Sequence, residues 1–149
     1  MTQNAHEDGT TTATSPARPL IIGGSIAAAV AGAATAAVAA AGQFAGISLV
    51  IGGMPITVLG FAVLTVVFSV VGLVLALVLA RTVRRPRTVF VRATVVLTVF
   101  SLVPDVLMDA SVTTKVLLML AHVIAAAIVV PAIARRLSVG ERQANEKSR

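Results

Sequence analysis

Polar residues of the kind that can exchange protons lie within two neighbouring apolar stretches of the sequence. Thr98, Ser101 and Asp105 are spaced at helical intervals, which places them on one face of a helix. His122 lies within the next apolar stretch. In an antiparallel helix pair, His122 reaches the depth of Thr98 and Ser101, with Asp105 on their outer side. A histidine beside a carboxyl group can titrate near neutral pH, which is the chemistry of a proton-coupled carrier or a pH sensor.

The same cluster has a simpler interpretation, in which it stabilises the contact between two helices. A neutral histidine that is hydrogen-bonded to a neighbouring hydroxyl contributes about 1 kcal/mol in a membrane bundle. One histidine and two hydroxyl groups are too few for a proton relay across a membrane, and the remaining apolar stretches contain no acidic residue. We therefore favour a structural role for His122 and keep a carrier as the alternative.

The residue content excludes several other kinds of chemistry. The chain has no cysteine, which rules out disulfide bonds, thiolate metal sites and iron–sulfur clusters. Asp105 and Asp109 lie one helical turn apart, but two carboxylates alone make a weak cation site. We expect both to be hydrated charges at the end of the helix. The sequence contains neither a phosphate-binding glycine loop nor the pattern of a catalytic triad. We therefore expect no catalytic, metal or cofactor site, and no enzymatic activity.

The composition indicates a membrane protein. Of the 149 residues, 57% are hydrophobic and 12% are charged, whereas soluble domains average about 45–50% apolar and about 25% charged residues. A net charge of +6 would also suit a nucleic-acid-binding protein, but the basic residues adjoin apolar stretches and only 3% of the residues are aromatic. We therefore expect the partner to be the lipid bilayer and not nucleic acid.

Four apolar stretches approach the roughly 20 residues that a helix needs to cross a bilayer. The third reaches this length only if its helix continues past Pro104, which is a residue that can instead end a helix. We predict an all-α membrane protein, in which residues 20–136 form a four-helix transmembrane bundle between a disordered tail (1–19) and a polar tail (137–149). The four predicted spans are residues 20–41, 56–80, 88–109 and 114–134.

The basic residues predict the orientation of these spans. Residues 81–87 contain four arginines and residues 135–149 add five basic residues, whereas the opposite connections contain only Lys115. Because basic loops stay on the cytoplasmic side, we predict a protein of the cell membrane with both termini in the cytoplasm. The first span also has features of a cleaved signal peptide. Its length of about 22 residues and the acidic residues before it favour a retained helix.

The connection between the first two spans, residues 42–55, has two interpretations. Two β-prone runs flank the pair Gly52-Gly53, and glycine supplies the positive φ that a tight hairpin turn requires. Pro55 weakens the second run as a strand, because proline fits only at an edge or at a strand start. The segment is therefore either a short outer β-hairpin or a flexible loop that leads into the second span.

Small residues recur at every fourth position of the first span, which predicts a face for close helix packing. Such a face serves either an interface with another chain or packing within the same bundle, and the alanine-rich character of the helix favours the latter. We expect the protein to act as a structural or accessory partner, in a homo-oligomer or with another membrane protein. The predicted packing face consists of Gly24, Ala28, Gly32, Ala36 and Ala40.

Two short stretches carry a resemblance to a known family. Residues 100–105 read Phe-Ser-Leu-Val-Pro-Asp, and residues 120–125 read Leu-Ala-His-Val-Ile-Ala, with Pro131 near the end of the fourth span. Together with the arginine-rich loop and the glycine-rich connection, they resemble a family of small actinobacterial membrane proteins catalogued as a domain of unknown function. The resemblance covers roughly residues 18–137. It implies four membrane helices and supplies no activity, substrate or cofactor.

Overall fold

The computed structural model describes residues 17–147, which form four long helices and one small hairpin. Each helix is long and apolar enough to cross a membrane, so the predicted fold class is confirmed. Most of the predicted N-terminal tail lies outside the described residues. The elements are α1 (Ala17–Phe44), β1 (Val50–Ile51), β2 (Met54–Pro55), α2 (Val58–Thr82), α3 (Pro86–Leu107) and α4 (Val112–Lys147).

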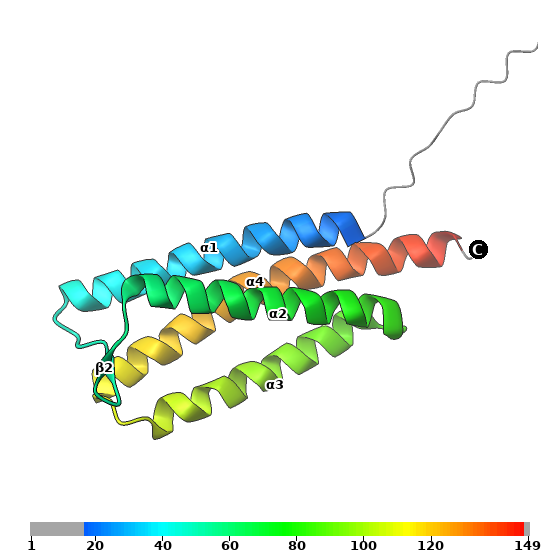
Figure 1. Ribbon diagram of the computed structural model, residues 1–149. Coiled ribbons are helices and arrows are strands. Elements are labelled where there is room, and N and C mark those ends of the chain that lie inside the picture. Colours follow the sequence, from blue (N-terminus) through cyan, green and yellow to red (C-terminus); the bar gives the residue numbers. More distant parts are fainter. Residues whose placement is uncertain (1–16, 148–149) are drawn as a thin grey trace, which may run out of the picture.

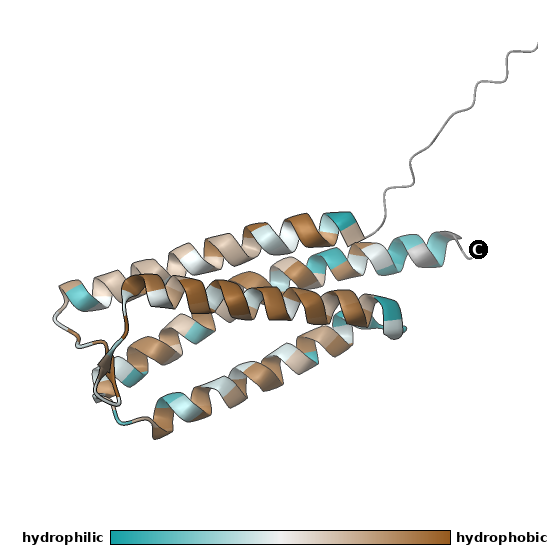
Figure 2. Cartoon of the chain, viewed as in Figure 1, coloured by the Kyte–Doolittle hydropathy of each residue, from teal (hydrophilic) through white to brown (hydrophobic). Residues whose placement is uncertain are grey.

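The helices form a bundle in which α1 packs against α2 and α4, while α3 packs mainly against α4. The turn between α2 and α3, the start of α1 and the end of α4 lie at one end, and the hairpin lies at the other (Figure 1). Figure 1 also shows α3 spreading away from α2 towards the hairpin. Polar residues gather at the end with the α2–α3 turn, and α2 is apolar along its length (Figure 2). We call these two ends the arginine-rich end and the hairpin end.

The helix boundaries differ from those predicted. Pro104 and Pro131 both lie inside helices, so neither ends its span. The helix α4 continues to Lys147, well beyond the predicted end at residue 134, and most of the predicted polar tail is therefore helical. The reason is that Leu137, at only 4% exposure, packs into the same core as the fully buried Phe90. The start of α2 at Val58 is set by Thr57, whose hydroxyl accepts a hydrogen bond from the backbone N–H of Gly60.

Two separate cores hold the bundle together, one towards each end. The core towards the arginine-rich end joins all four helices. The core at the hairpin end joins α1, α2 and α4 with the chain that enters the hairpin. The first core is formed by Leu20, Ala31, Leu73, Ala76, Phe90, Val129, Ile133, Ala134 and Leu137. The second is formed by Ala39, Leu49, Phe61, Leu117, Leu118 and Ala121.

The connection between α1 and α2 is a hairpin, which decides between the two interpretations of the sequence. The φ angles of Gly52 and Gly53 are 56° and 79°, a conformation open mainly to glycine, and they let β1 and β2 pair in antiparallel register. The hairpin is tied to the α3–α4 turn, because Gly52 N–H donates to the carbonyl of Asp109 (3.2 Å). The Thr114 hydroxyl also donates to the carbonyl of Ser48 (2.6 Å).

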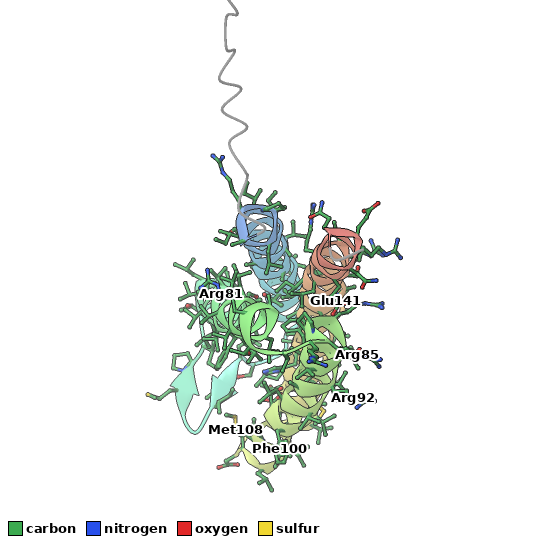
Figure 3. The ribbon with its side chains drawn as sticks, turned by 90° about the vertical axis from the view of Figure 1, so that its right-hand side faces the viewer. Arg81, Arg85, Arg92, Phe100, Met108 and Glu141 are labelled. Atoms are coloured by element: carbon green, nitrogen blue, oxygen red, sulfur yellow. The ribbon has the colours of Figure 1, made fainter. Side chains whose placement is uncertain are left out.

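The start of α3 receives a carboxylate from the extended part of α4. The residue before this helix, Arg85, makes no side-chain capping bond, and the backbone N–H of Arg87 instead donates to Oε1 of Glu141 (3.1 Å). Figure 3 views the molecule from this end, with Glu141 on α4 and Arg85 just before α3. A carboxylate at this position satisfies a free N–H group and interacts favourably with the helix dipole.

We expect Glu141→Ala to lower the free energy of unfolding by about 1 kcal/mol, because α3 then loses its only observed side-chain cap among residues 17–147. The measurement is reversible unfolding of the purified chain in detergent micelles. Glu146→Ala is the matched control, since it removes the same charge from an exposed position of the same helix. Equal losses in both variants would show that only the net charge matters and would contradict the capping role.

Candidate functional site

The structure brings His122 of α4 and Asp105 of α3 into contact. The ring nitrogen Nδ1 of His122 lies 3.1 Å from Oδ2 of Asp105. The side chain of Asp105 is only 4% exposed, whereas that of His122 is 39% exposed. A carboxyl group is costly to bury in an apolar environment without a partner, so the histidine is the group that makes this burial tolerable.

The same nitrogen has a second partner on its own helix. His122 Nδ1 lies 3.0 Å from the carbonyl oxygen of Leu118 in hydrogen-bond geometry. Asp105 Oδ2 has no hydrogen bond in good geometry with any residue in the range 17–147, although it lies at ion-pair distance from the ring. Because Nδ1 carries at most one proton, it donates to one acceptor at a time. A direct hydrogen bond to Asp105 therefore requires the imidazole to turn away from Leu118.

The predicted hydroxyl members of the cluster do not join this contact. Thr98 donates to the carbonyl of Thr94 (2.8 Å), and Ser101 donates to the carbonyl of Thr98 (2.7 Å), so both hydroxyls bond within α3. The predicted depth of His122, level with these hydroxyls, was therefore wrong by more than one helical turn. The prediction requires the end of α3 and the start of α4 to lie at a common depth at their shared turn, and they do not.

The register between the two helices explains this offset. Arg87 contacts Glu141 near one end of α3, and Asp105 contacts His122 near the other. The chain covers almost the same number of residues between these contacts on each helix, so both belong to one antiparallel register. In this register the first turns of α4 extend beyond the end of α3. There the buried Leu117 packs in the core at the hairpin end.

The interpretation of Asp105 as a hydrated residue at a helix end was also wrong. Asp105 is 3% exposed, because the end of α3 lies against the side of α4 and not against its end. Asp109 is the residue that is exposed, in the turn after α3. Within residues 17–147, His, Cys, Asp and Glu side chains form no group of three that could hold a metal ion.

The His122–Asp105 contact holds one end of α3 against the bundle. The buried residues of α3 are Pro86, Phe90 and Asp105, and none of the residues between the last two is buried. The first turns of α3 are held by the aromatic ring of Phe90 in the core, and the last turns are held by Asp105 on His122. The middle of the helix is uncovered on its apolar side, where large side chains such as Leu97 (57%) and Phe100 (68%) are exposed.

The predicted packing face of the first span lies largely inside the bundle. Gly24, Ala28 and Gly32 are buried, whereas Ala36 and Ala40 are half-buried. A Cβ atom at Gly24 would lie 2.6 Å from a methyl group of Leu73 in α2, so the two helices touch at this glycine. A Cβ atom at Gly32 would likewise lie 2.9 Å from a methyl group of Val66 in α2. These contacts are made within one chain.

A polar contact between α1 and α2 was missed by the sequence reasoning. The hydroxyl groups of Thr35 and Thr65 lie 2.9 Å apart, and Thr35 is 1% exposed. The signal was available, because Thr35 follows Gly32 by three residues and Ser69 follows Thr65 by four. Polar residues thus share a face with the packing residues on both helices.

A family model for proteins of unknown function, DUF6069, matches residues 15–139, which is most of the chain. The chain belongs to this family. The resemblance inferred from residues 100–105 and 120–125 is thereby confirmed, while the actinobacterial source stays an expectation. No curated protein and no solved structure matches the chain. The DUF6069 family supplies no activity, and its four apolar helices make this member an integral membrane protein of unknown activity.

Proposed function

We propose that this DUF6069 protein is a non-enzymatic accessory subunit, which acts by packing the uncovered middle of α3 against another membrane protein. The proposal places it in the cell membrane, with both termini and the α2–α3 turn in the cytoplasm. The excess of arginines at that end supports this orientation. Because these basic residues adjoin membrane spans, the proposal includes no nucleic acid among the partners.

The observation that carries the proposal is that α3 is only weakly apolar and yet has few residues buried by the rest of the chain. Among the four spans α3 has the lowest mean hydropathy, and it is also the least covered by the rest of the chain. In its most apolar stretch 11% of the residues are buried, compared with 33% in α1, which has almost the same hydropathy. A weakly apolar helix gains more from contact with protein than from contact with lipid. The uncovered side of α3 is therefore the face on which we place the partner.

The internal polar groups support an accessory role over transport. The hydroxyls of Thr94, Thr98 and Ser101 each donate to a carbonyl of their own helix. Thr35 and Thr65 pair with each other between α1 and α2. A hydroxyl group that donates to its own helix can offer a passing substrate only its acceptor lone pairs.

The experiment uses the natural lack of cysteine in the chain, which makes every introduced thiol unique. Leu97→Cys places a thiol on the uncovered middle of α3, and Val71→Cys places one on α2 at matched exposure (57% and 59%). We expect a thiol-to-amine crosslinker, applied in native membranes, to join Leu97→Cys to one partner protein that mass spectrometry identifies. Val71→Cys should give no such product. Equal crosslinking from both positions, or none from either, would contradict the proposal.

The orientation is tested with a membrane-impermeant maleimide on intact cells. Phe44→Cys lies at the hairpin end, where Phe44 is 94% exposed, and Gln143→Cys lies on the exposed end of α4. We expect labelling of the first variant in intact cells and of the second only after the membrane is permeabilised. The reverse pattern would invert the proposed topology.

A second candidate is a proton-coupled carrier, and the buried Asp105 with its incomplete hydrogen bonding is the observation that favours it. The test is ion and substrate flux into liposomes that contain the purified chain or its His122→Gln variant. Flux that disappears in a variant with unchanged stability would favour the carrier. Loss of bundle stability in a chain without flux would favour the accessory role.

A further inference from the structure

A cavity of about 350 Å³ opens between α1 and α4 at the arginine-rich end. One part of its wall is apolar and another part is formed by two adjacent arginines. The lining residues are Gly23, Ile26, Ala132, Arg135, Arg136 and Val139. Because α1 and α4 run in opposite directions, Ile26 and Ala132 lie on the side nearer the middle of the bundle, and the arginines lie nearer its end. The cavity is thus apolar towards the bilayer interior, and its side towards the bilayer surface contains the two arginines together with Val139.

The two arginines have no carboxylate partner within the described part of the chain. Across residues 17–147 the structure shows one ion pair, between His122 and Asp105, which lies elsewhere. Arg135 and Arg136 are both exposed, so their guanidinium groups are free to bind an anion. A guanidinium group binds phosphate oxygens through paired N–H donors, which gives it both charge and geometric complementarity.

The glycine in the lining makes room for one of these side chains. A Cβ atom at Gly23 would lie 2.9 Å from Nε of Arg136, which is closer than side-chain contacts allow. The absence of a side chain on α1 therefore lets the guanidinium group lie against the helix at the wall of the cavity. Ile26, one turn further along α1, is 61% exposed and presents an apolar surface beside it.

We propose that this cavity binds the phosphate group of an anionic phospholipid, with the phosphate on Arg135 and Arg136 and an acyl chain along Ile26 and Ala132. Basic pockets between membrane helices at the headgroup level are suited to anionic lipid headgroups. Charged residues are costly in hydrocarbon, which places these arginines at the surface of the bilayer. The site is independent of the accessory role of α3, because its lining residues lie on α1 and α4 and none lies on α3.

The test is native mass spectrometry of the full chain in detergent, titrated with phosphatidylglycerol, with phosphatidylcholine and with inorganic phosphate alone. We expect retention of phosphatidylglycerol over phosphatidylcholine. The double variant Arg135→Gln/Arg136→Gln should lower the affinity by about tenfold or more, the factor that follows from losing one hydrogen bond to a charged group. The matched control, Arg84→Gln/Arg85→Gln, removes two charges from the same end but outside the cavity, and should change the affinity by less than about twofold.

A third variant separates the shape of the cavity from its charge. Gly23→Leu fills the space and moves the guanidinium group of Arg136 away from α1 without removing any charge, and it should also weaken phosphatidylglycerol binding. Displacement of the lipid by millimolar inorganic phosphate would support the phosphate site and assign it to a soluble anion. Lack of displacement would assign it to the lipid. The proposal would be overturned if both double variants lost the same affinity for phosphatidylglycerol, or if Arg135→Gln/Arg136→Gln lost none.

Discussion

Replacing His122 with leucine is expected to lower the free energy of unfolding by about 3 kcal/mol. The substitution leaves the carboxyl group of Asp105 buried at 3% exposure with no partner on α4. A buried polar group that loses its partner costs about 1–3 kcal/mol, and a buried charge that loses its partner costs about 3–5 kcal/mol. We expect a value between these ranges because the His122 side chain is 39% exposed. The measurement is reversible unfolding in detergent micelles.

The effect should be asymmetric between the two partners. Asp105→Leu should cost less, because His122 keeps its hydrogen bond to Leu118 and is less deeply buried than Asp105. The double variant Asp105→Leu/His122→Leu should be more stable than His122→Leu alone, since no buried carboxyl group remains. A double variant that is as unstable as the single one would show that the loss comes from packing and would contradict the role of the pair.

Hydrogen exchange locates the consequence of the same substitution. Asp105 is the only buried residue of α3 after Phe90, so its release should free the second half of this helix. We expect faster amide exchange in His122→Leu over residues 98–107, and unchanged exchange around Phe90, which stays in the core. Val123→Leu is the control, because Val123 is 51% exposed on the same turn of α4. Uniform acceleration along the whole of α3 would be evidence against a localised anchor.

Replacing Gly32 with leucine is expected to lower the free energy of unfolding by about 2–3 kcal/mol. A Cβ atom at this position would lie 2.9 Å from Val66 and 3.4 Å from the backbone carbonyl oxygen of Ala62, and the backbone cannot turn aside. The larger side chain must therefore push α1 and α2 apart, and overpacking of this kind costs about 1–3 kcal/mol. Separation of the helices also breaks the Thr35–Thr65 hydroxyl contact, which accounts for the upper part of the range.

The chain offers a matched control for this substitution. Gly72 lies in α2, and nothing lies within 4 Å of the position that its Cβ atom would take. Gly72→Leu therefore makes the same chemical change in open space, and the higher helix propensity of leucine should leave the bundle unchanged or slightly more stable. Both variants are compared by unfolding in the same micelles. If they lose stability equally, close contact between α1 and α2 is not what holds the bundle together.

Local features of the sequence predicted the elements of this fold, because their causes act over a few residues. Runs of apolar residues predicted all four helices, and the conformational freedom of the pair Gly52-Gly53 made the hairpin one of two alternatives. The end of α4 could not be predicted in this way. Residues 137–147 are polar in composition. This part of α4 is held by Leu137, which is buried in the core that contains Phe90, and by Glu141, which caps the start of α3.

The candidate site shows where the sequence alone stops. The sequence singled out His122 and Asp105 as candidate functional residues, since an ionisable residue in or beside an apolar stretch is visible without a structure. Their contact depends on the register between α3 and α4, which is set by packing at both ends of α3 and by the extension of α4 beyond it. The sequence therefore determined that this protein is a four-helix membrane protein with an imidazole group inside its fourth span and a carboxyl group near the end of its third. Only the tertiary structure decided that these two groups meet, because the offset between two helices depends on contacts far apart in the chain.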